Sequence, residues 1–433
     1  MSEVTPDPGG GRATTERVRL TGIDWLLTGV GPARGPVRTW TDVGLRGACE
    51  VVVERAGPRA PWLLAQLGSA DDAHGAAVDR TCDLGGVGLM PGWVDAHTHA
   101  VFAGDRATEF NQRLAGRSYA EIAAEGGGIL RTMRGTRQAS VAELVASATP
   151  RLEEMAAWGT RVAEIKTGYG LDTASEVRLL EAIGQLADNF AGRLRIIATA
   201  MPGHAVPPEY KTDPDAYVTQ VCATILPAMA ASGVACPFVD VFVEEGYFDV
   251  PRAERIAAAG AALGMALKAH VDEFKDIGGV DWAVARGAVS VEHLLVTNDD
   301  AVATLAASDT VAVCLPLTSV FLREGFAPMR ALIDAGCLVA VATDCNPGSA
   351  MSANLHLAMQ MAVLGGHMTP QEAVRGVTVG GAAALGGAVG PLGWDGRLCV
   401  GAPFLATALA IDGPDRLFYE LGAPPRAVPL QLD

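Results

Sequence analysis

The feature that most constrains the fold of this chain is an alternation of short apolar runs with helix-like segments, which begins near Val87. Such an alternation is typical of a parallel α/β sheet or barrel. The apolar runs lie at residues 88–97, 160–166, 194–200, 238–243, 265–270, 288–293, 311–315 and 338–344. Eight strand–helix units over about 300 residues match a TIM (β/α)8 barrel, whose active site lies at the carboxyl ends of the strands. A doubly wound parallel sheet is the alternative.

The two ends of the chain differ from this central part in composition and residue pattern. Residues 1–17 are rich in Pro, Gly and charged side chains and predict a disordered tail. Short β-like pieces follow the tail, residues 57–80 are mostly loop-like, and β-like alternation returns after the last helix. We therefore expect a catalytic barrel domain at 87–389 and a small β domain built from 18–86 and 390–433.

Composition narrows the class of function. The chain has 433 residues and a formal net charge of −16, which argues against a general surface for nucleic acid or anionic membrane. The longest apolar runs are too short to cross a bilayer, and the N-terminal residues lack the apolar segment of a signal peptide. The eight cysteines are dispersed without a CxxC pair, which favours reduced thiols and a cytoplasmic location. We expect no nucleic-acid partner and no membrane.

Chemically reactive residues recur where seven of the eight apolar runs end. Five of the eight histidines lie between His74 and His356, and all five stand at a run end or just past one. The polar ends are His97-Thr98-His99, Glu164 to Gly170, His204, Glu244-Glu245, His270-Val271-Asp272-Glu273, Glu292-His293 and Thr343 to Ser349. The seventh run is the exception, because it ends in Leu315-Pro316-Leu317. Since parallel strands end at one face of a barrel, we expect the polar ends to line one site.

A metal site is the interpretation that these residue types favour. Residues i and i+2 of a strand point to the same face, so the imidazoles of His97 and His99 can converge on one point. His270 adds a third imidazole, and Asp344 adds a hard oxygen. This set suits one zinc or iron ion with an open position for a water, whose pKa such an ion lowers to about 7. For each histidine alone, the competing interpretation is a hydrogen-bonded core residue.

Two further strand-end residues have the chemistry of an acid–base pair. Glu273, three residues past His270, can relay protons, and its competing interpretation is a solvated loop carboxylate. His293 can polarise a carbonyl or steady a metal-bound hydroxide, and its competing interpretation is a structural histidine.

Three other features are less specific. Arg106 follows the first strand closely and can bind a substrate carboxylate through both guanidinium nitrogens, although an arginine in a loop is usually solvated. The run Gly126-Gly127-Gly128 lacks the Lys-Ser/Thr of a phosphate-binding loop and predicts an active-site loop or a plain turn. Lys166 is interpreted as a structural lysine, not as the modified bridging lysine of a two-metal site, because the fourth run ends in Glu244.

The motifs at the strand ends resemble the amidohydrolase superfamily and, within it, the imidazolonepropionase family. The resemblance extends from about Val87 to Leu385. It rests on PGWVDAHTHAVFAGDRATEF (91–110), SYAEIAAEGGGI (118–129), EIKTGYGLD (164–172), ATAMPGHAVPPEY (198–210), KAHVDEFKDIGG (268–279), FLREGFAPMRALIDAG (321–336) and ATDCNPGS (342–349).

The resemblance implies an amidohydrolase-type barrel with a β-sandwich domain, a cytoplasmic homodimer, and one Zn²⁺ or Fe²⁺/Fe³⁺ ion per subunit. The implied metal ligands are His97, His99, His270 and Asp344. The implied substrate-binding residues are Arg106, Tyr169, His204, Glu273, Asn346, Gly348 and Ser349. The expected catalytic residues are Glu273, His293 and Asp344.

The activity that the resemblance implies is hydrolysis of the ring amide C–N bond of 4-imidazolone-5-propanoate to N-formimidoyl-L-glutamate, a step of histidine degradation, by a metal-activated water. Either Glu273 or Asp344 would move the proton to the leaving nitrogen. The first alternative is another amidohydrolase, such as an aminohydrolase that releases ammonia from a purine-like or guanidino substrate. The second is a barrel that binds a metal or a small ligand without catalysis.

Overall fold

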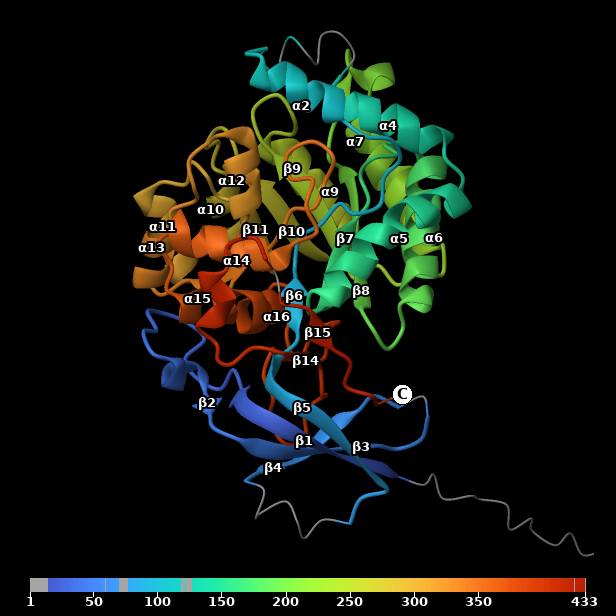
Figure 1. Ribbon diagram of the computed structural model, residues 1–433. Coiled ribbons are helices and arrows are strands. Elements are labelled where there is room, and N and C mark those ends of the chain that lie inside the picture. The colour runs from blue at the N-terminus through green and yellow to red at the C-terminus, as the bar shows by residue number, and fades with distance from the viewer. Residues whose placement is uncertain are drawn as a thin grey trace, which may run out of the picture.

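The computed structural model describes residues 15–58, 60–69, 77–117, 121, 127–423 and 425–432. Most of the expected tail at residues 1–17 therefore lies outside the described residues, and strand β1 (Glu16–Leu27) begins inside that range. The motif at residues 118–129 also lies largely outside them. Figure 1 shows a barrel with surrounding helices above a small β domain.

In the described part of the chain, eight strands pair in parallel and follow one another in sequence order around the barrel. They are β6 (Trp93–Asp95), β7 (Thr160–Lys166), β8 (Arg195–Gly203), β9 (Phe238–Val243), β10 (Ala266–Val271), β11 (Ser290–His293), β12 (Val311–Cys314) and β13 (Leu338–Val341). Parallel neighbours require crossover connections, and helices supply them here. The predicted TIM barrel is confirmed.

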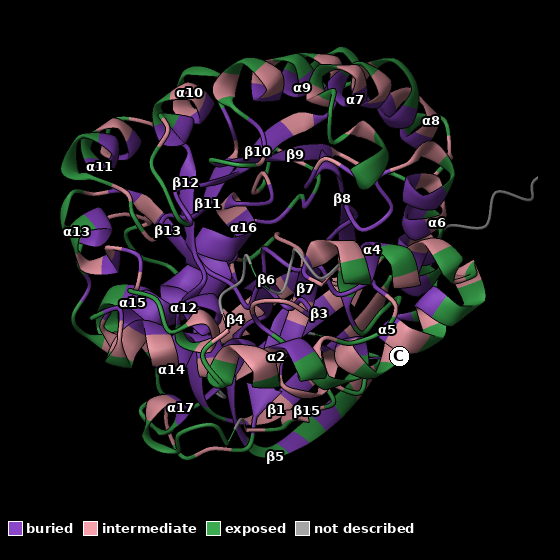
Figure 2. Ribbon diagram, turned by 90° about the horizontal axis from the view of Figure 1, so that it is seen from above, coloured by how far each residue is buried: buried purple, intermediate pink, exposed green. Residues whose placement is uncertain are grey.

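Helices surround the barrel, with their buried sides turned toward the strands and their exposed sides outward (Figure 2). They are α2 (Ala107–Leu114), α4 (Ile129–Gln138), α5 (Val141–Ala157), α6 (Thr173–Asn189), α7 (Pro214–Gln220), α8 (Leu226–Ala230), α9 (Val250–Ala262), α10 (Gly279–Ala285), α11 (Asp299–Ala306), α12 (Pro316–Leu322), α13 (Met329–Asp334), α14 (Leu355–Leu364), α15 (Pro370–Arg375), α16 (Gly381–Ala383) and α17 (Arg416–Tyr419). The local sequence determines where several of these helices begin. Ser140, for example, accepts a hydrogen bond from the backbone N–H of Glu143 and begins α5 with a capping box.

The barrel closes between its first and last strands, β6 and β13, through side chains and loop backbone. Asp95 accepts hydrogen bonds from the backbone N–H and from Oγ1 of Thr343, at 3.0 and 2.6 Å. One residue further on, the backbone N–H of Asp344 donates to the carbonyl of His97, at 3.0 Å. Closure of the barrel therefore brings His97 beside Asp344, although the two residues stand at opposite ends of the barrel sequence.

The small β domain contains one sheet to which both ends of the chain contribute. Among the described residues it has seven strands, in the order β15-β14-β5-β1-β3-β4, with β2 paired to β1. Besides β1, they are β2 (Leu45–Arg46), β3 (Cys49–Arg55), β4 (Leu63–Gly68), β5 (Arg80–Pro91), β14 (Ala406–Leu409) and β15 (Ala427–Val428). Leu20, Val51, Leu89 and Ala408 are among the buried residues that form a core separate from that of the barrel. The division at residue 87 stays a prediction, and β5 crosses it.

Two details differ from the sequence-based expectations. The apolar run 88–97 serves two sheets, because its first residues end β5, which pairs with β1 and β14, and only Trp93–Asp95 form β6. An apolar run shows burial but not which sheet buries it. The segment 57–80, expected as a loop, contains β4, whose Leu64 pairs antiparallel with Val53 of β3. Its strand conformation depends on that partner.

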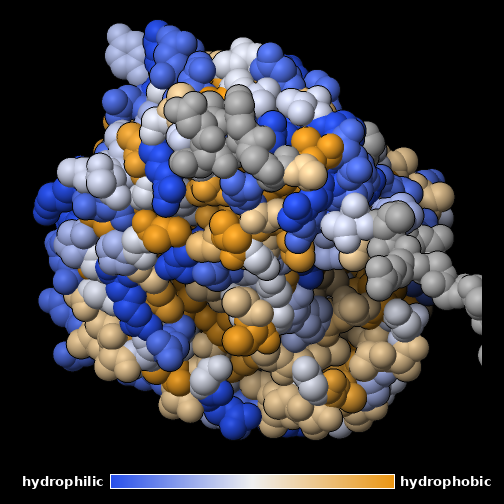
Figure 3. Space-filling view, turned by 90° about the horizontal axis from the view of Figure 1, so that it is seen from below, coloured by the Kyte–Doolittle hydropathy of each residue, from blue (hydrophilic) through white to orange (hydrophobic). Residues whose placement is uncertain are grey.

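The outer surface has a mixed character. Seen from below, the side of the β domain, hydrophobic and hydrophilic side chains are intermingled, with hydrophobic ones more frequent in the lower part of the view (Figure 3). None of the helices in the described ranges is long and apolar enough to cross a membrane.

We predict that Gly380→Ala destabilises the barrel at its last strand, β13. A Cβ at Gly380 would lie 2.1 Å from the carbonyl oxygen of Val339 and 3.2 Å from the Cα of Ala340, both backbone atoms of β13. Because backbone cannot turn aside as a side chain does, the free energy of unfolding should fall by about 1–3 kcal/mol, measured by urea denaturation. Gly325→Ala is the control, since no described atom lies within 4 Å of its added Cβ. Equal stability of the two variants would contradict this packing.

Candidate metal centre and substrate cavity

Four potential metal-binding side chains meet at the carboxyl end of the barrel. Nε2 of His99 lies 3.2 Å from Nε2 of His270, and Oδ1 of Asp344 lies 3.3 Å from Nε2 of His97 and 3.8 Å from Nε2 of His99. Donors bound about 2.1 Å from one tetrahedral ion lie about 3.4 Å from one another. The distances among these four side chains are compatible with ligation of a single ion.

The protonation states of His99 and His270 agree with metal binding. Burial, with neighbouring histidines, holds the pKa of His99 and of His270 well below the usual range, so both rings are neutral, as metal ligands must be. Burial also lowers the pKa of His97, but the carboxylates of Glu292, 2.5 Å from Nδ1, and of Asp344 together raise it to about 9. Nδ1 therefore keeps its proton. Nε2 of His97 is buried and lies 3.3 Å from Oδ1 of Asp344, on the side of the other candidate ligands.

Asp344 is fixed in its ionised form. Oδ2 accepts hydrogen bonds from the hydroxyls of Thr318 and Ser349, at 2.6 and 3.3 Å, so Oδ1 is left toward the histidines. Burial alone would raise the pKa of Asp344, yet the contacts with His97, His293 and Thr318 lower it below its usual range. Its backbone has a φ of 54°, a left-handed conformation that turns the end of β13 toward the cavity.

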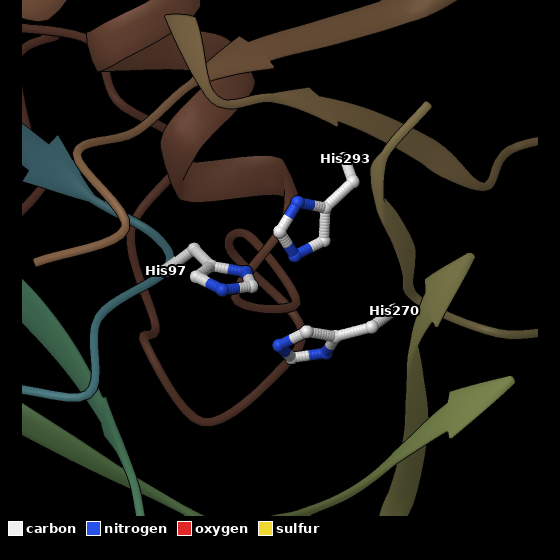
Figure 4. A group of neighbouring side chains, drawn as sticks. All are labelled: His97, His270 and His293. Atoms are coloured by element: carbon white, nitrogen blue, oxygen red, sulfur yellow. The ribbon is translucent and has the colours of Figure 1, made fainter. Parts of the chain in front are cut away.

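His293 and Glu273 lie beside this centre. Figure 4 shows the rings of His97, His270 and His293 facing one another. One nitrogen from each of these rings could also bind an ion, so the three residues form a second possible ligand group. Nε2 of His293 lies 3.7 Å from Oε2 of Glu273. Burial, reinforced by Asp344, raises the pKa of Glu273 well above its usual range, whereas burial lowers that of His293 well below it. A carboxyl and a neutral imidazole are therefore paired next to the metal site.

The loop after β10 directs Glu273 into the cavity. Asp272 has a φ of 53°, which turns the chain immediately after the strand, and its Oδ2 accepts a hydrogen bond from Thr297 at 2.8 Å. Glu244, at the end of β9, accepts hydrogen bonds from the backbone N–H groups of Phe274 and Lys275, at 2.9 and 3.2 Å. The side chain of Glu244 thus stabilises the loop that holds Glu273.

One cavity of about 330 Å³ brings the predicted site residues together. The predicted ligands His99, His270 and Asp344 line it, and so does His293. All predicted substrate-binding residues also line it, namely Arg106, Tyr169, His204, Glu273, Asn346, Gly348 and Ser349. His97 is buried directly behind this wall. Lining residues without a predicted role include Arg113, Arg117, Phe242, Tyr247 and Phe274.

The KTGYGLD segment after β7 shapes one side of the cavity. Gly168 has a φ of 101°, and a Cβ there would lie 3.0 Å from the ring of His204, whose Nδ1 is 3.2 Å from the Gly168 carbonyl. The buried carboxylate of Glu176 accepts backbone N–H hydrogen bonds from Gly168, Gly170 and Leu171, at 3.1, 2.8 and 2.8 Å. These contacts fix the backbone on both sides of Tyr169.

The turn after β13 forms another part of the cavity wall. The amide of Asn346 donates to the Asp344 carbonyl and to Oγ of Ser349, and its oxygen accepts from the N–H groups of Gly348 and Ser349. Asn346 therefore holds the turn together. A Cβ at residue 348 would lie 2.3 Å from Nη1 of Arg106, so a side chain there would displace this guanidinium. Arg113 donates to the Gly348 carbonyl at 3.0 Å.

Some residues near the centre had no predicted role. Asp240 lies inside β9, and a carboxylate within the apolar stretch FVDVFV is itself a signal, because buried acids are rare unless paired. Thr318 follows the one run that ends in apolar residues, and nothing in the sequence singles it out. Lys166 forms ion pairs with three carboxylates, which agrees with its interpretation as a structural lysine. Gly128 donates its N–H to Glu109 at 3.0 Å, while Gly126 lies outside the described residues.

We predict that Glu176→Gln lowers the stability of the protein. The amide can replace only one acceptor oxygen, so its NH2 group would face the N–H of Gly168. A buried donor without an acceptor costs about 1–3 kcal/mol, which urea denaturation should detect. Glu181→Gln, an exposed position on the same helix α6, is the matched control and should leave the unfolding curve unchanged. If both variants keep wild-type stability, the Glu176 hydrogen bonds do not hold this loop.

The chain matches a protein-family model, and its fold is similar to solved structures. Residues 253–393 match the model of the Amidohydrolase family. Solved structures with similar folds include atrazine chlorohydrolase from Arthrobacter aurescens TC1 complexed with zinc, at a TM-score of 0.64 and 17% identity over 94% of this chain and 92% of that one. An adenosine deaminase from Xanthomonas campestris with bound zinc has a TM-score of 0.64 and 16% identity over 94% and 89% of the two chains. At such identities the likeness shows the fold alone.

Sequence relatives are much more similar. The imidazolonepropionase of Herpetosiphon aurantiacus is 43% identical over 377 residues, which cover 84% of this chain and 85% of the relative. That of Pseudomonas putida is 43% identical over 374 residues, or 86% and 88% of the two chains. The chain therefore belongs to the imidazolonepropionase family of the amidohydrolase superfamily.

Proposed function

We propose that this protein hydrolyses the ring amide C–N bond of 4-imidazolone-5-propanoate and releases N-formimidoyl-L-glutamate. The observation that carries the proposal is the cavity of about 330 Å³, in which three of the four predicted metal ligands and all predicted substrate-binding residues meet. Family membership at 43% identity supports the same reaction. The substrate is a small molecule.

We propose that His97, His99, His270 and Asp344 hold one zinc or iron ion per subunit. Their mutual distances and the neutral rings of His99 and His270 support this ligand set. When bound, such an ion supplies a water of lowered pKa and a positive charge beside the scissile carbonyl. His293 is the alternative ligand, because its nitrogen also groups with those of His97 and His270.

The part of the cavity wall around Arg106 is suited to the propionate group of the substrate. Arg106 lines the cavity with its guanidinium beside Gly348, and its Nε is held by Glu109 at 2.8 Å. A guanidinium fixed in this way is suited to bind a carboxylate through two hydrogen bonds. The rings of Tyr169 and His204, whose centroids are 5.3 Å apart, form the wall for the flat imidazolone ring.

Hydrolysis adds the oxygen of water to the ring carbonyl carbon and a proton to the departing ring nitrogen. We assign the proton transfer to Glu273 and not to Asp344. Oδ2 of Asp344 is engaged by two hydroxyls, whereas Glu273 lies on the cavity wall beside His293. A buried carboxyl with a raised pKa can carry the proton, and neutral His293 can donate a hydrogen bond to the oxygen as its negative charge develops.

Two further expectations stay predictions. We propose a cytoplasmic location, supported by the cysteines, all of which are free thiols in the structure. We also propose a homodimer, on the strength of the family resemblance, and light scattering during size-exclusion chromatography would measure the mass of the assembly.

The activity test is direct. Purified protein mixed with freshly prepared 4-imidazolone-5-propanoate should remove the ultraviolet absorbance of the ring and form N-formimidoyl-L-glutamate. Activity should disappear when a chelator removes the metal and should return when zinc or iron is added back, and elemental analysis of the purified protein identifies the native ion. Release of free ammonia without formation of that product would instead indicate an aminohydrolase, and the absence of metal-dependent turnover would contradict the proposal.

We predict that Arg106→Met raises KM for the imidazolone substrate by about 10- to 100-fold, because a hydrogen bond to a charged group contributes about 1.5–3 kcal/mol. The effect on kcat should be much smaller if the arginine binds the carboxylate far from the scissile bond. Arg131→Met serves as the control, since its guanidinium is nearly half exposed and lies 4.0 Å from the same Glu109. A KM unchanged by Arg106→Met would remove this residue from the substrate site.

A further inference from the structure

A closed set of charged side chains lies directly beneath the metal site, inside the barrel. It consists of Glu164 and Lys166 on β7, Asp240 on β9, Lys268 on β10 and Glu292 on β11, all with 0% exposure. We call these five residues the buried charge network. We propose that this network positions two of the metal-binding histidines and sets the affinity of the centre for its ion. The inference rests on the metal site of the proposed function.

Ion pairs connect the members of the network. Nζ of Lys166 lies 2.8 Å from Glu164, 2.7 Å from Asp240 and 2.9 Å from Glu292. Nζ of Lys268 lies 2.9 Å from Oε1 of Glu292 and donates to the carbonyls of Ala96 and Ala384. Both ammonium groups are therefore surrounded by acceptors that belong to barrel strands or the helix beside them.

Each of two network carboxylates also contacts a histidine. Oδ1 of Asp240 lies 3.0 Å from Nδ1 of His270, while its Oδ2 accepts from Lys166. Oε2 of Glu292 lies 2.5 Å from Nδ1 of His97 and 2.9 Å from Lys166. An imidazole that donates its Nδ1 proton to a carboxylate presents Nε2 to an ion, in one tautomer and one ring orientation. The ammonium of Lys166, in turn, prevents either carboxylate from rotating away.

The formal charges favour a cation above the network. When the imidazoles are counted as the neutral rings that bind an ion, three carboxylates and two ammonium groups leave one net negative charge in a region closed to water. Asp344 adds a second negative charge close by. Buried charge is costly unless it is compensated. A divalent cation compensates both negative charges, so its binding should be strengthened by the network as well as by its direct ligands.

A purely structural network makes a different prediction. If these ion pairs only filled the barrel interior, then isosteric loss of one carboxylate would lower the stability of metal-free and metal-loaded protein equally. Metal affinity would then not change. Measurement of zinc affinity on the whole protein therefore separates the two roles without relying on enzyme activity.

The test compares Glu292→Gln and Asp240→Asn with wild-type protein by competition for zinc against a chromogenic chelator. The zinc Kd should rise about 10- to 100-fold in both variants, as is typical when a partner of a ligand histidine is lost. The visible bands of cobalt-loaded protein should also shift, because the ligand rings reorient. Asp240→Asn leaves the pair of Lys268 with Glu292 intact, so it tests the inference even if Glu292→Gln does not fold.

Glu372→Gln is the matched control. Its carboxylate is also buried and pairs with Arg330 at 2.8 Å, but it caps helix α15 away from the centre. Its zinc Kd and cobalt spectrum should stay at wild-type values. Wild-type affinity in folded Glu292→Gln and Asp240→Asn proteins would overturn the inference and leave the proposed reaction intact. If His270→Ala bound zinc as tightly as wild type, the metal site itself would be wrong, and both proposals would fail.

Discussion

The site depends on the closure of the barrel between β6 and β13. Asp95 and Thr343 join the two strands through two hydrogen bonds, and the backbone of His99 continues the seam by donating to the Cys345 carbonyl at 3.0 Å. A parallel sheet that failed to close here would leave two unpaired edges and would separate the His-x-His pair from Asp344. The contact that completes the fold is thus also the contact that assembles the ligand set.

Conformational strain is concentrated at the same end of the barrel. Asp272, His293 and Asp344 have φ values of 53°, 80° and 54°, which non-glycine residues rarely adopt. Each stands where a strand ends and its side chain or its neighbour enters the cavity. Strain of about 1–3 kcal/mol per residue persists only where surrounding contacts impose it. Here hydrogen bonds from Thr297 and Thr318 help to hold Asp272 and Asp344.

Opposite electrostatic environments separate the pKa values of the two acids in the candidate metal centre and support their different proposed roles. Asp344 accepts hydrogen bonds and faces histidines, which keeps its carboxylate ionised, whereas Glu273 is buried close to that negative charge, which favours its protonated form. Such separation of pKa values distinguishes a ligand from a proton carrier. Beneath them, the buried charge network joins four strands of the barrel to the rings of His97 and His270, so the packing of the barrel and the geometry of the ligands are linked.

The barrel and much of the candidate site could be predicted from the sequence, because apolar runs and the polar residues that end them are local properties. His97, His99 and His270 could be recognised from their places at run ends, and the motifs around Arg106 and Tyr169 indicated the substrate side. The contacts between side chains of different strands inside the barrel could not be predicted in this way. Two such contacts are the pairing of Asp240 with His270 and the hydrogen bond from Thr318 to Asp344. The run 88–97 is likewise divided between two sheets by strands that are distant in the chain. No local pattern specifies such contacts, since they exist only after the barrel has closed.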